Sequence, residues 1–553
     1  MIQSSIPSWT QGYDPLGNPR LSTLVAAIPV CFLFYLLAVR KTVAHRAAVY
    51  AFVVAVALAL AAFRMPPVMV GAAVAHGLVY AVVRIGWTLV CAVFIYELTV
   101  ETGHFEVIKE SIGAVTDDRR LQILLIAFAF GAVLEGAGGG GAPVAICGAM
   151  MAGLGFNPFA AAVLCLIANT SPVAYGGVGN PIRVLGAVTG LPEADLSAMA
   201  GRILPWTALI LPFWLVRSTA KTRETLEVWP GLVVCGATFA AVQFYWSNYQ
   251  DAALVDIVGG MATLGALALF FQVWRPKRIW RYPGEPSVKP ASQRRHTTRQ
   301  VLHAWSPFLL LAVFVIVWGM PSIKNALDTF TTRAPVPGLH LKVIRQPPVV
   351  AKEQAEAAVF DLAWISAIGT ATFLAGLIAG PVLGLGLRGT LRVFFRTCYR
   401  MRFSMVAILA MIGLGFITRY SGMDAVMGLA MTHTGALYPF FGTMLGWLGV
   451  ALTGTDAGSN ALFGSLQVIT ANQLGLSPVL MAAANSAGGV MGKMIDAQSI
   501  IVACAATGQE GREGDLFRAV LWHSIALAAI VGLIVTLYAY AAPGWVPAGR
   551  SFD

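Results

Sequence analysis

Five ionisable residues lie in or beside long apolar stretches that are interrupted by Gly, Asn, Ser and Thr: Glu135, Arg183, Asp456, Lys493 and Asp496. An ionised group inside a lipid bilayer is costly, so it pairs, faces a wet cavity or changes its protonation state. Such groups suit the binding of protons and small anions.

The carboxyl groups are candidate proton carriers. Glu135 follows a long apolar run and has no cation close to it in the sequence. Desolvation there favours its neutral form, as proton coupling requires; the alternative is a structural carboxyl that is hydrogen-bonded to nearby backbone. Asp456, flanked by Thr455, Ser459 and Asn460, either takes a proton, binds a cation or braces its turn. Asp496 is the third candidate.

Two cations are candidate ligands for a carboxylate substrate. A small carboxylate needs positive potential, which a cation or a helix N-terminus supplies. Arg183 offers a two-pronged hydrogen-bonding group and Lys493 a point charge. The alternative for each is an anchor at the membrane interface or a partner for Glu135, Asp456 or Asp496.

Neutral polar side chains stand at two matching places in the chain. Asn169, Thr170 and Ser171 occur at one of them, and Asn485 and Ser486 at the other. Their donors and acceptors suit a substrate hydroxyl group. Hydrogen bonds between helices are an equal alternative.

Other kinds of site lack the residues they need. The glycine run 138–141 resembles a phosphate cradle, but no Walker lysine follows it. His104, His433 and His523 are isolated, and the seven cysteines are scattered singly. The sequence therefore predicts no catalytic centre, no metal site and no cofactor, and hence a protein that is not an enzyme.

The chain contains an internal repeat with three landmarks in each copy: a polar tip, a Leu-Gly-x-x-Pro turn and an Ala-Asn-Ser/Thr element. The first copy has them at 134–143, 154–158 and 168–171, and the second at 452–461, 474–478 and 484–487. Backbone exposed to lipid costs several kcal/mol per unsatisfied group, so such breaks must be buried or line a wet cavity. In secondary transporters, paired breaks of this kind form the central binding site.

Composition identifies the solvent around these elements as lipid. Hydrophobic residues make up 57% of the 553 positions and charged residues 11%, against roughly 25% charged in soluble domains. Apolar runs such as 21–39, 47–63 and 516–541 fit the ~20 residues that cross a bilayer. We expect an all-α polytopic membrane protein with about 12–14 transmembrane helices and two repeats that contain broken or re-entrant helices.

The net charge of +11 follows from basic loops at 40–46, 217–223, 275–303 and 388–402. The positive-inside rule places such loops in the cytoplasm and explains the charge better than nucleic-acid binding does. The N-terminus is then outside, and the polar, proline-rich segment 323–360 is an extracytoplasmic loop. Residues 1–20 lack the order of a cleavable signal, so we expect the first span to be retained.

The expected units follow the chain in order. They are N-terminal transmembrane helices (1–120), a first broken-helix element (121–200), transmembrane helices with a basic cytoplasmic loop (201–322), the extracytoplasmic loop (323–360), further transmembrane helices (361–436), a second broken-helix element (437–505), and a C-terminal helix and tail (506–553).

The repeat residues resemble the lactate permease family of hydroxycarboxylate/proton symporters. The similar stretches in the repeats include Gly131-Ala-Val-Leu-Glu-Gly-Ala-Gly, Leu166-Ile-Ala-Asn-Thr-Ser-Pro-Val-Ala, Leu452-Thr-Gly-Thr-Asp, Ser459-Asn-Ala-Leu-Phe, Ala484-Asn-Ser-Ala-Gly-Gly-Val, Gly492-Lys-Met-Ile and Gln498-Ser-Ile. Others, such as Tyr13-Asp-Pro-Leu-Gly-Asn and Asp515-Leu-Phe-Arg, extend the similarity to nearly the whole chain.

The resemblance implies import of lactate, glycolate or a related small hydroxymonocarboxylate across the bacterial inner membrane together with protons. The alternatives are an organic-anion exchanger, or a channel for a larger or more charged carboxylate. Matched by motif, the positions that the resemblance marks are Glu135, Asn169, Asp456, Ser459, Asn460, Asn485, Lys493, Gln498 and Ser499.

Three departures from the family pattern bear on the substrate. Gly139 and Gly140 leave no aromatic residue at the first tip, Arg183 follows a proline in a segment that is normally apolar, and Asp496-Ala497 replaces Ser-Pro. These changes predict either a substrate that is larger or more charged than lactate, or an ion pair between Arg183 and Asp496.

Overall fold

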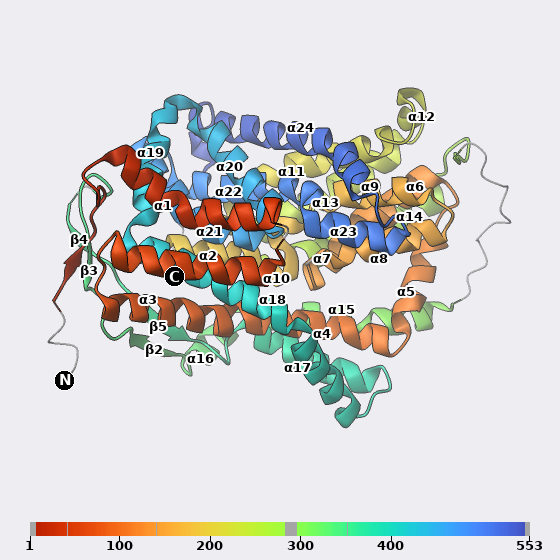
Figure 1. Ribbon diagram of the computed structural model, residues 1–553. Coiled ribbons are helices and arrows are strands. Elements are labelled where there is room, and N and C mark those ends of the chain that lie inside the picture. The colour runs from red at the N-terminus through yellow and green to blue at the C-terminus, as the bar shows by residue number, and fades with distance from the viewer. Residues whose placement is uncertain (1–6, 41, 140, 283–295, 351, 548–553) are drawn as a thin grey trace.

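The computed structural model describes residues 7–40, 42–139, 141–282, 296–350 and 352–547. Gly140 and the part of the basic loop that holds Lys289, Arg294 and Arg295 lie outside the described residues. The described chain is a bundle of helices with short strands at one end (Figure 1).

Helices fill most of the described chain, which confirms the all-α prediction. The first helices are α1 (Pro19–Phe34), α2 (Ala44–Ala61), α3 (Pro67–Tyr80), α4 (Trp87–Glu101) and α5 (His104–Gly113). The first repeat copy comprises α6 (Arg119–Ile123), α7 (Gly131–Ala137), α8 (Ala142–Gly153), α9 (Pro158–Ala168) and α10 (Gly176–Thr189). The second copy comprises α20 (Tyr438–Thr453), α21 (Asp456–Gln473), α22 (Pro478–Gly492) and α23 (Ala497–Thr507), and α24 (Glu513–Tyr540) follows it.

The two copies are separated by further helices and by short strands. The helices are α11 (Glu193–Arg217), α12 (Thr222–Leu226), α13 (Trp229–Tyr249), α14 (Val255–Val273), α15 (Thr298–Gly319), α16 (Pro321–Asp328), α17 (Ile368–Val382), α18 (Leu387–Ser421) and α19 (Met423–Met431). Short π or 3-10 turns extend or join helices: η1 (Tyr35–Val39), η2 (Ala81–Gly86), η3 (Leu124–Phe130), η4 (Val173–Tyr175), η5 (Ala252–Leu254), η6 (Thr432–Leu437), η7 (Lys493–Ile495) and η8 (Pro543–Trp545).

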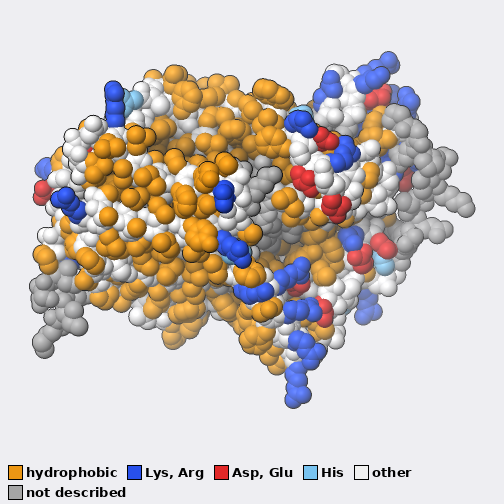
Figure 2. Space-filling view, in the orientation of Figure 1, with side chains coloured by type: hydrophobic (Ala, Val, Ile, Leu, Met, Phe, Trp, Pro, Cys, Tyr) orange, Lys and Arg blue, Asp and Glu red, His pale blue; other side chains and the backbone are white. Residues whose placement is uncertain are grey.

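The outer surface is that of a membrane protein. Ten helices of the described residues are long and apolar enough to cross a membrane, or up to 12 if each of two bent helix pairs is one span. Large apolar side chains point outward, such as Leu24, Val273 and Trp522, which are 67%, 86% and 72% exposed. Figure 2 shows hydrophobic side chains over a broad, continuous part of the surface. A surface of this kind requires lipid around it.

The Leu-Gly-x-x-Pro turns of the two copies have the same local construction. Gly155 and Gly475 adopt left-handed φ values of 97° and 66°, which end the preceding helix. The Asn157 side chain accepts hydrogen bonds from the first turn of α9, and the Ser477 side chain does so for α22. A proline then occupies the first position of each helix, where its missing N–H costs nothing.

The two copies enter the bundle from opposite ends, so the repeat is inverted. The first turn lies beside α6, because the Arg119 guanidinium donates a hydrogen bond of 2.7 Å to the Leu154 carbonyl. The second turn lies beside the loop before β4, because the Gln473 amide donates to the Pro348 carbonyl. Figure 1 places α8 and α9 on one side of the molecule and the start of α22 toward the other.

Each copy contains a bent helix pair, but the two bends lie at different places. The first, of 63°, falls between α9 and η4, directly after Asn169. The second, of 41°, falls between η7 and α23, at Asp496. Helix α22 therefore continues through Asn485, and the matching Ala-Asn elements play different parts in the two copies.

The segment expected as an extracytoplasmic loop forms short strands. These are β2 (Thr332–Pro335), β3 (Val343–Arg345), β4 (Gln354–Ala355) and β5 (Val359–Leu362). Strand β2 pairs antiparallel with β5, and β3 pairs antiparallel with β4 and parallel with β1 (Trp9–Thr10). The N-terminal segment and the strands thus share one end of the molecule, and α12 lies toward the other (Figure 1).

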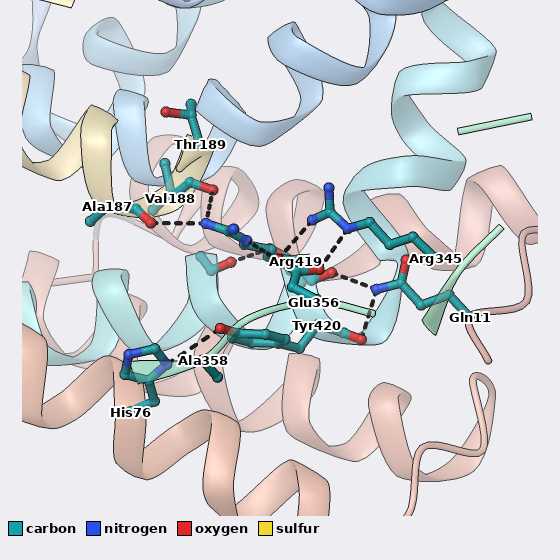
Figure 3. Close-up of polar contacts among 12 residues, drawn as sticks. Gln11, His76, Ala187, Val188, Thr189, Arg345, Glu356, Ala358, Arg419 and Tyr420 are labelled. Atoms are coloured by element: carbon teal, nitrogen blue, oxygen red, sulfur yellow. Dashed lines mark hydrogen bonds and ion pairs between the residues drawn. The ribbon is translucent and has the colours of Figure 1, made fainter. Parts of the chain in front are cut away.

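A buried ion network joins this strand-bearing end to the helices (Figure 3). The Glu356 carboxylate accepts hydrogen bonds of 2.6 and 3.0 Å from Arg345 and one of 2.6 Å from Arg419 of α18. Arg419 also donates to the carbonyls of Ala187 and Val188 at 3.0 and 2.9 Å. The network therefore ties the strand-bearing segment to the end of the broken-helix element in the first copy.

Candidate functional site

Glu135 lies near the end of α7, a helix in the middle of the molecule (Figure 1). Its side chain is 3% exposed and rests against glycine backbone. A Cβ atom at Gly176 would lie 2.6 Å from Glu135 Oε1, and one at Gly139 would lie 3.4 Å from it. A side chain at Gly176 would therefore collide with the carboxyl, whereas one at Gly139 would only touch it. Its Oε2 atom accepts no hydrogen bond from the part of the chain that the structure describes.

Asn169 lies next to the Glu135 carboxyl, where α9 ends and the chain bends. It is buried, and neither atom of its amide group has a hydrogen-bond partner among the described residues. The Ser171 hydroxyl is likewise buried and without a described partner. Thr170 differs, because its hydroxyl donates a 2.8 Å hydrogen bond to the Ile167 carbonyl. The bend therefore presents open donors and acceptors from two of the three predicted residues.

The backbone that follows this bend is unusual. Within the stretch assigned to α10, Gly177, Val178 and Gly179 have left-handed φ values of 52°, 59° and 73°. A β-branched residue rarely adopts that region, so Val178 holds local strain. The regular part of α10 begins only after these three residues.

The polar residues of the second copy bond mainly to one another. Asp456 Oδ2 accepts hydrogen bonds from the Ser486 hydroxyl and, at 3.4 Å, from the Asn460 amide. The Asn485 amide donates to Asn460 Oδ1 at 2.9 Å, and the Ser459 hydroxyl donates to the Gly446 carbonyl at 3.0 Å. Hydrogen bonding between helices, the alternative that the sequence left open, is what this network provides.

One bond of the network crosses between the copies. The Asn460 amide donates a 3.1 Å hydrogen bond to the Pro181 carbonyl of α10. The Asn485 side chain is also held from its other side, since Gln467 donates to its carbonyl at 3.1 Å. The second copy thus supports the first and presents fewer open polar atoms.

Lys493 and Asp496 form a buried ion pair at the bend of the second copy. Their Nζ and Oδ2 atoms are 3.2 Å apart, and Lys493 also donates to the Gly454 carbonyl at 2.6 Å. Asp496 Oδ1 accepts from the Ser499 N–H at 2.9 Å and so caps α23. The Ser499 hydroxyl has no partner in the described chain, and Gln498 is exposed.

Arg183 lies apart from this centre. Its Nη2 atom donates to Asp251 Oδ1 at 3.1 Å, and its Nε lies 3.9 Å from Glu193 Oε2. Asp496 is occupied by Lys493. The predicted ion pair between Arg183 and Asp496 is therefore wrong, because each group has a nearer partner of opposite charge.

Two buried groups were missed by the sequence reasoning. Asp256 of α14 is fully buried, and neither carboxyl oxygen has a partner within the described residues. Gln243 of α13 donates to the Ser171 carbonyl at 3.4 Å, but its own Oε1 atom has no described partner. Asp256 is the single acid in the apolar run 252–273, and this isolation was the sequence signal that could have identified it.

These groups make a centre suited to a small polar anion. A Cβ atom at Gly141 would lie 3.9 Å from the Ser499 hydroxyl, and Lys493 donates to the Gly454 carbonyl, so the bend of the second copy borders both tips. The structure brings Glu135 and Asn169 together with Lys493 and Asp496, and places Asp456 in its own network beside them. No group of three or more His, Cys, Asp or Glu residues in the described chain is arranged to hold a metal ion.

Comparison with known proteins identifies relatives over nearly the full chain. The profile of the L-lactate permease family matches residues 22–542. The glycolate permease GlcA of Escherichia coli is 45% identical over 97% of this chain and 99% of its own length. An L-lactate permease of Salmonella typhimurium is 43% identical over 98% of this chain and 100% of its own.

These matches and the candidate spans establish a multi-pass transport protein of the bacterial inner membrane. The predicted family and the predicted location are both confirmed. The chain belongs to the L-lactate permease family.

Proposed function

We propose that the protein is a secondary active transporter that imports lactate, glycolate or a related small hydroxymonocarboxylate together with protons. The similarity to a glycolate permease and an L-lactate permease supports this substrate class. The observation that carries the proposal is the pair of open, buried polar groups at the first bend. Asn169 and Ser171 offer donors and acceptors for a hydroxyl and a carboxylate, and Glu135 stands next to them.

Charge supports the coupling to protons. Both cations that the sequence predicted at the site are already in ion pairs, Arg183 with Asp251 and Lys493 with Asp496. A carboxylate that enters the site thus adds negative charge next to Glu135. Desolvation makes two neighbouring negative charges costly, so binding of the anion favours protonation of Glu135.

Among the three carboxyls predicted for coupling, we assign the proton to Glu135. Asp456 accepts hydrogen bonds from Ser486 and Asn460, and Asp496 is paired and caps a helix. Those contacts give both residues a structural task. Arg183, Lys493 and the amides of the second copy then act as supports, and Asn169 and Ser171 contact the substrate.

The same geometry disfavours a more charged substrate. That alternative depended on added charge from Arg183 and Asp496, and both charges are neutralised by their partners. An exchanger is distinguished from a symporter by its need for a counter-substrate, and a channel by its failure to accumulate substrate against a gradient.

Uptake into proteoliposomes tests the proposal. Labelled lactate, glycolate and larger hydroxyacids are offered with and without an inward proton gradient, and in the absence of any internal anion. We expect the two small acids to accumulate above the outside concentration only when the gradient is present. Accumulation that requires an internal anion, or equilibration without accumulation, would reject the symporter.

A further inference from the structure

Asp256 is a buried acid with no evident structural task. It is the second residue of α14, a position where an acid normally bonds to free N–H groups or interacts with the helix dipole. Here it is 0% exposed, and neither Oδ1 nor Oδ2 accepts a hydrogen bond from any residue that the structure describes. A desolvated carboxyl that accepts no hydrogen bond is stable only when it is neutral, or when a neighbouring group changes its own charge to compensate.

Asp256 meets the end of α7 at the residue after Glu135. A Cβ atom at Gly136 would lie 2.8 Å from the Asp256 Cβ and 2.9 Å from the Ile257 nitrogen. The two helices therefore touch backbone to backbone, and the Glu135 carboxyl acts electrostatically on Asp256. The two acids belong to different candidate spans, Arg119–Ala137 and Ala252–Val273.

The surroundings of this pair offer little compensating charge. Glu135 is influenced by Lys493 and Asp496, which neutralise each other across 3.2 Å, and Asp256 acts on Tyr175. The other charged or titratable side chains on the described elements that pack against α7 and α14 are Cys91, Tyr96, Glu97, Glu101, Cys147, Arg183, Cys235, Tyr245, Tyr249, Arg299 and His303. Among these, Arg183, Glu97 and Glu101 have ion-pair partners of their own.

We propose that Asp256 is a second proton-binding carboxyl that works as a pair with Glu135. The inference deepens the proposed function and rests on it. Asp256 packs against the residue that follows Glu135, and two neighbouring acids in a desolvated site cannot both stay charged, so the pair holds at least one proton. When the substrate anion enters, the remaining carboxylate of the pair takes a proton from water on the outer side and becomes a neutral acid. The acid returns this proton to water on the inner side after the anion has left.

This cycle keeps the buried charge constant. One negative charge resides either on the carboxyl pair or on the substrate, and never on both at once. Each carboxylate anion is thereby accompanied by one proton, and the loaded centre has the same charge as the empty one. Asp256 adds a second carboxyl to this cycle, so the proton can move between the two acids as the site changes state.

The test compares Asp256→Asn with Asp424→Asn in proteoliposomes. Asp424 of α19 is the matched control, since it is also buried and both its carboxyl oxygens lack a partner in the described chain, but it lies in another helix. Two readouts are measured for labelled lactate and glycolate: accumulation on a proton gradient, and exchange of internal against external substrate without a gradient. Exchange requires a folded protein and an intact substrate site but no net movement of protons.

We expect gradient-driven accumulation by Asp256→Asn to fall to about the level that is reached without a gradient, while exchange persists. The pH dependence of the remaining uptake becomes flatter. Asp424→Asn keeps both activities. If Asp256→Asn accumulates substrate with the wild-type pH profile, or if Asp424→Asn loses accumulation to the same extent, the pair is rejected. Loss of exchange in Asp256→Asn also rejects it, because the residue then serves the structure or the substrate.

The wild-type protein separates this inference from the proposed function. Failure of the wild type to accumulate either acid on a proton gradient rejects the proposed function itself. Wild-type accumulation with an unaffected Asp256→Asn variant rejects only the role of Asp256.

Discussion

Two regions of the molecule bury carboxyl groups in opposite ways. At the strand-bearing end, both oxygens of Glu356 accept hydrogen bonds from arginines (Figure 3). At the centre, Glu135 Oε2 and both oxygens of Asp256 lack partners within the described residues. A fully paired acid keeps one charge state and holds structure together. An unpaired one is free to change its charge, which is what a transport cycle needs.

The electrostatics of Glu356 agree with a fixed charge. Burial alone would raise the pKa of this carboxyl, but the guanidinium groups of Arg419 and Arg345 more than offset burial and hold its pKa below the usual value. Glu356 is thus ionised throughout the physiological range. The comparison predicts that changes at this end affect stability, and that changes at the centre affect coupling.

The largest effect is expected from Glu356→Ala. Breaking a buried ion pair leaves Arg419 without its carboxylate and costs about 3–5 kcal/mol of stability. Thermal unfolding of the detergent-solubilised protein measures the loss. Glu353→Ala, at an exposed position three residues earlier, is the matched control and should change little. Equal melting temperatures for the two variants would show that the network does not fix the strand-bearing end.

Glu135→Gln should show the reverse pattern. Accumulation of substrate falls to about the level that is reached without a proton gradient, because the amide binds and releases no proton. The unfolding temperature stays the same or rises, because a desolvated acid has been replaced by a neutral group of the same shape. Both quantities are measured on one preparation. A marked loss of stability with intact accumulation would place Glu135 among the structural acids and remove the contrast.

Asn169→Ala tests the substrate side of the centre. A hydrogen bond to a charged ligand contributes about 1.5–3 kcal/mol, so the apparent affinity for lactate or glycolate should fall about tenfold or more. Asn460→Ala is the useful comparison, because that amide bonds to Pro181 and Asp456. Asn460→Ala should have its main effect on the unfolding temperature and a smaller effect on the affinity for the substrate. An unchanged affinity in Asn169→Ala would exclude this amide as a ligand.

A smaller effect is expected in the pH dependence of stability, which depends on the charge of Glu356. Because the pKa of Glu356 is lowered on folding, its ionised form stabilises the protein at pH values above the ordinary glutamate value of about 4.3. That stabilisation decreases as the pH falls through the folded-state pKa. The stability difference between wild type and Glu356→Gln, measured by denaturation from pH 7 downward, should therefore shrink below about pH 4. A constant difference over that range would mean that the charge of Glu356 does not stabilise the fold.

Much of this arrangement was predictable from the sequence, because it follows from local pattern. Apolar runs predicted the helices, and the duplicated Leu-Gly-x-x-Pro turns predicted the repeat. Glu135 and Asn169 stood out as polar residues in apolar surroundings. The Thr170 hydroxyl, by contrast, donates to the Ile167 carbonyl at the end of its own helix, which residue type alone does not reveal.

The unpredicted parts depend on contacts between distant segments. Asp256 resembled an ordinary acid in the first turn of a helix, and only the close approach of α7 and α14 at Gly136 brings it to Glu135. Arg183 pairs with Asp251, which is 68 residues away in the sequence, and no spacing rule predicts that pair. The second copy has Gly488 where the first has Pro172, so no proline ends α22 there, and the bend falls instead at Asp496, which caps α23.

The smallest effect is expected from Arg183→Ala. Its guanidinium is engaged by Asp251 and Glu193, so its removal should leave the apparent affinity for every tested carboxylate unchanged. Because Asp251 and Glu193 are more than a third exposed, water replaces the lost partner and the stability loss stays near 0–1 kcal/mol. Asp251→Asn should show the same pattern. The apparent affinities of both variants are measured from the uptake of lactate, glycolate and larger hydroxyacids as a function of concentration. A selective loss of affinity for one acid in Arg183→Ala alone would return Arg183 to the substrate site, and would show that a paired charge at the edge of the centre also takes part in transport.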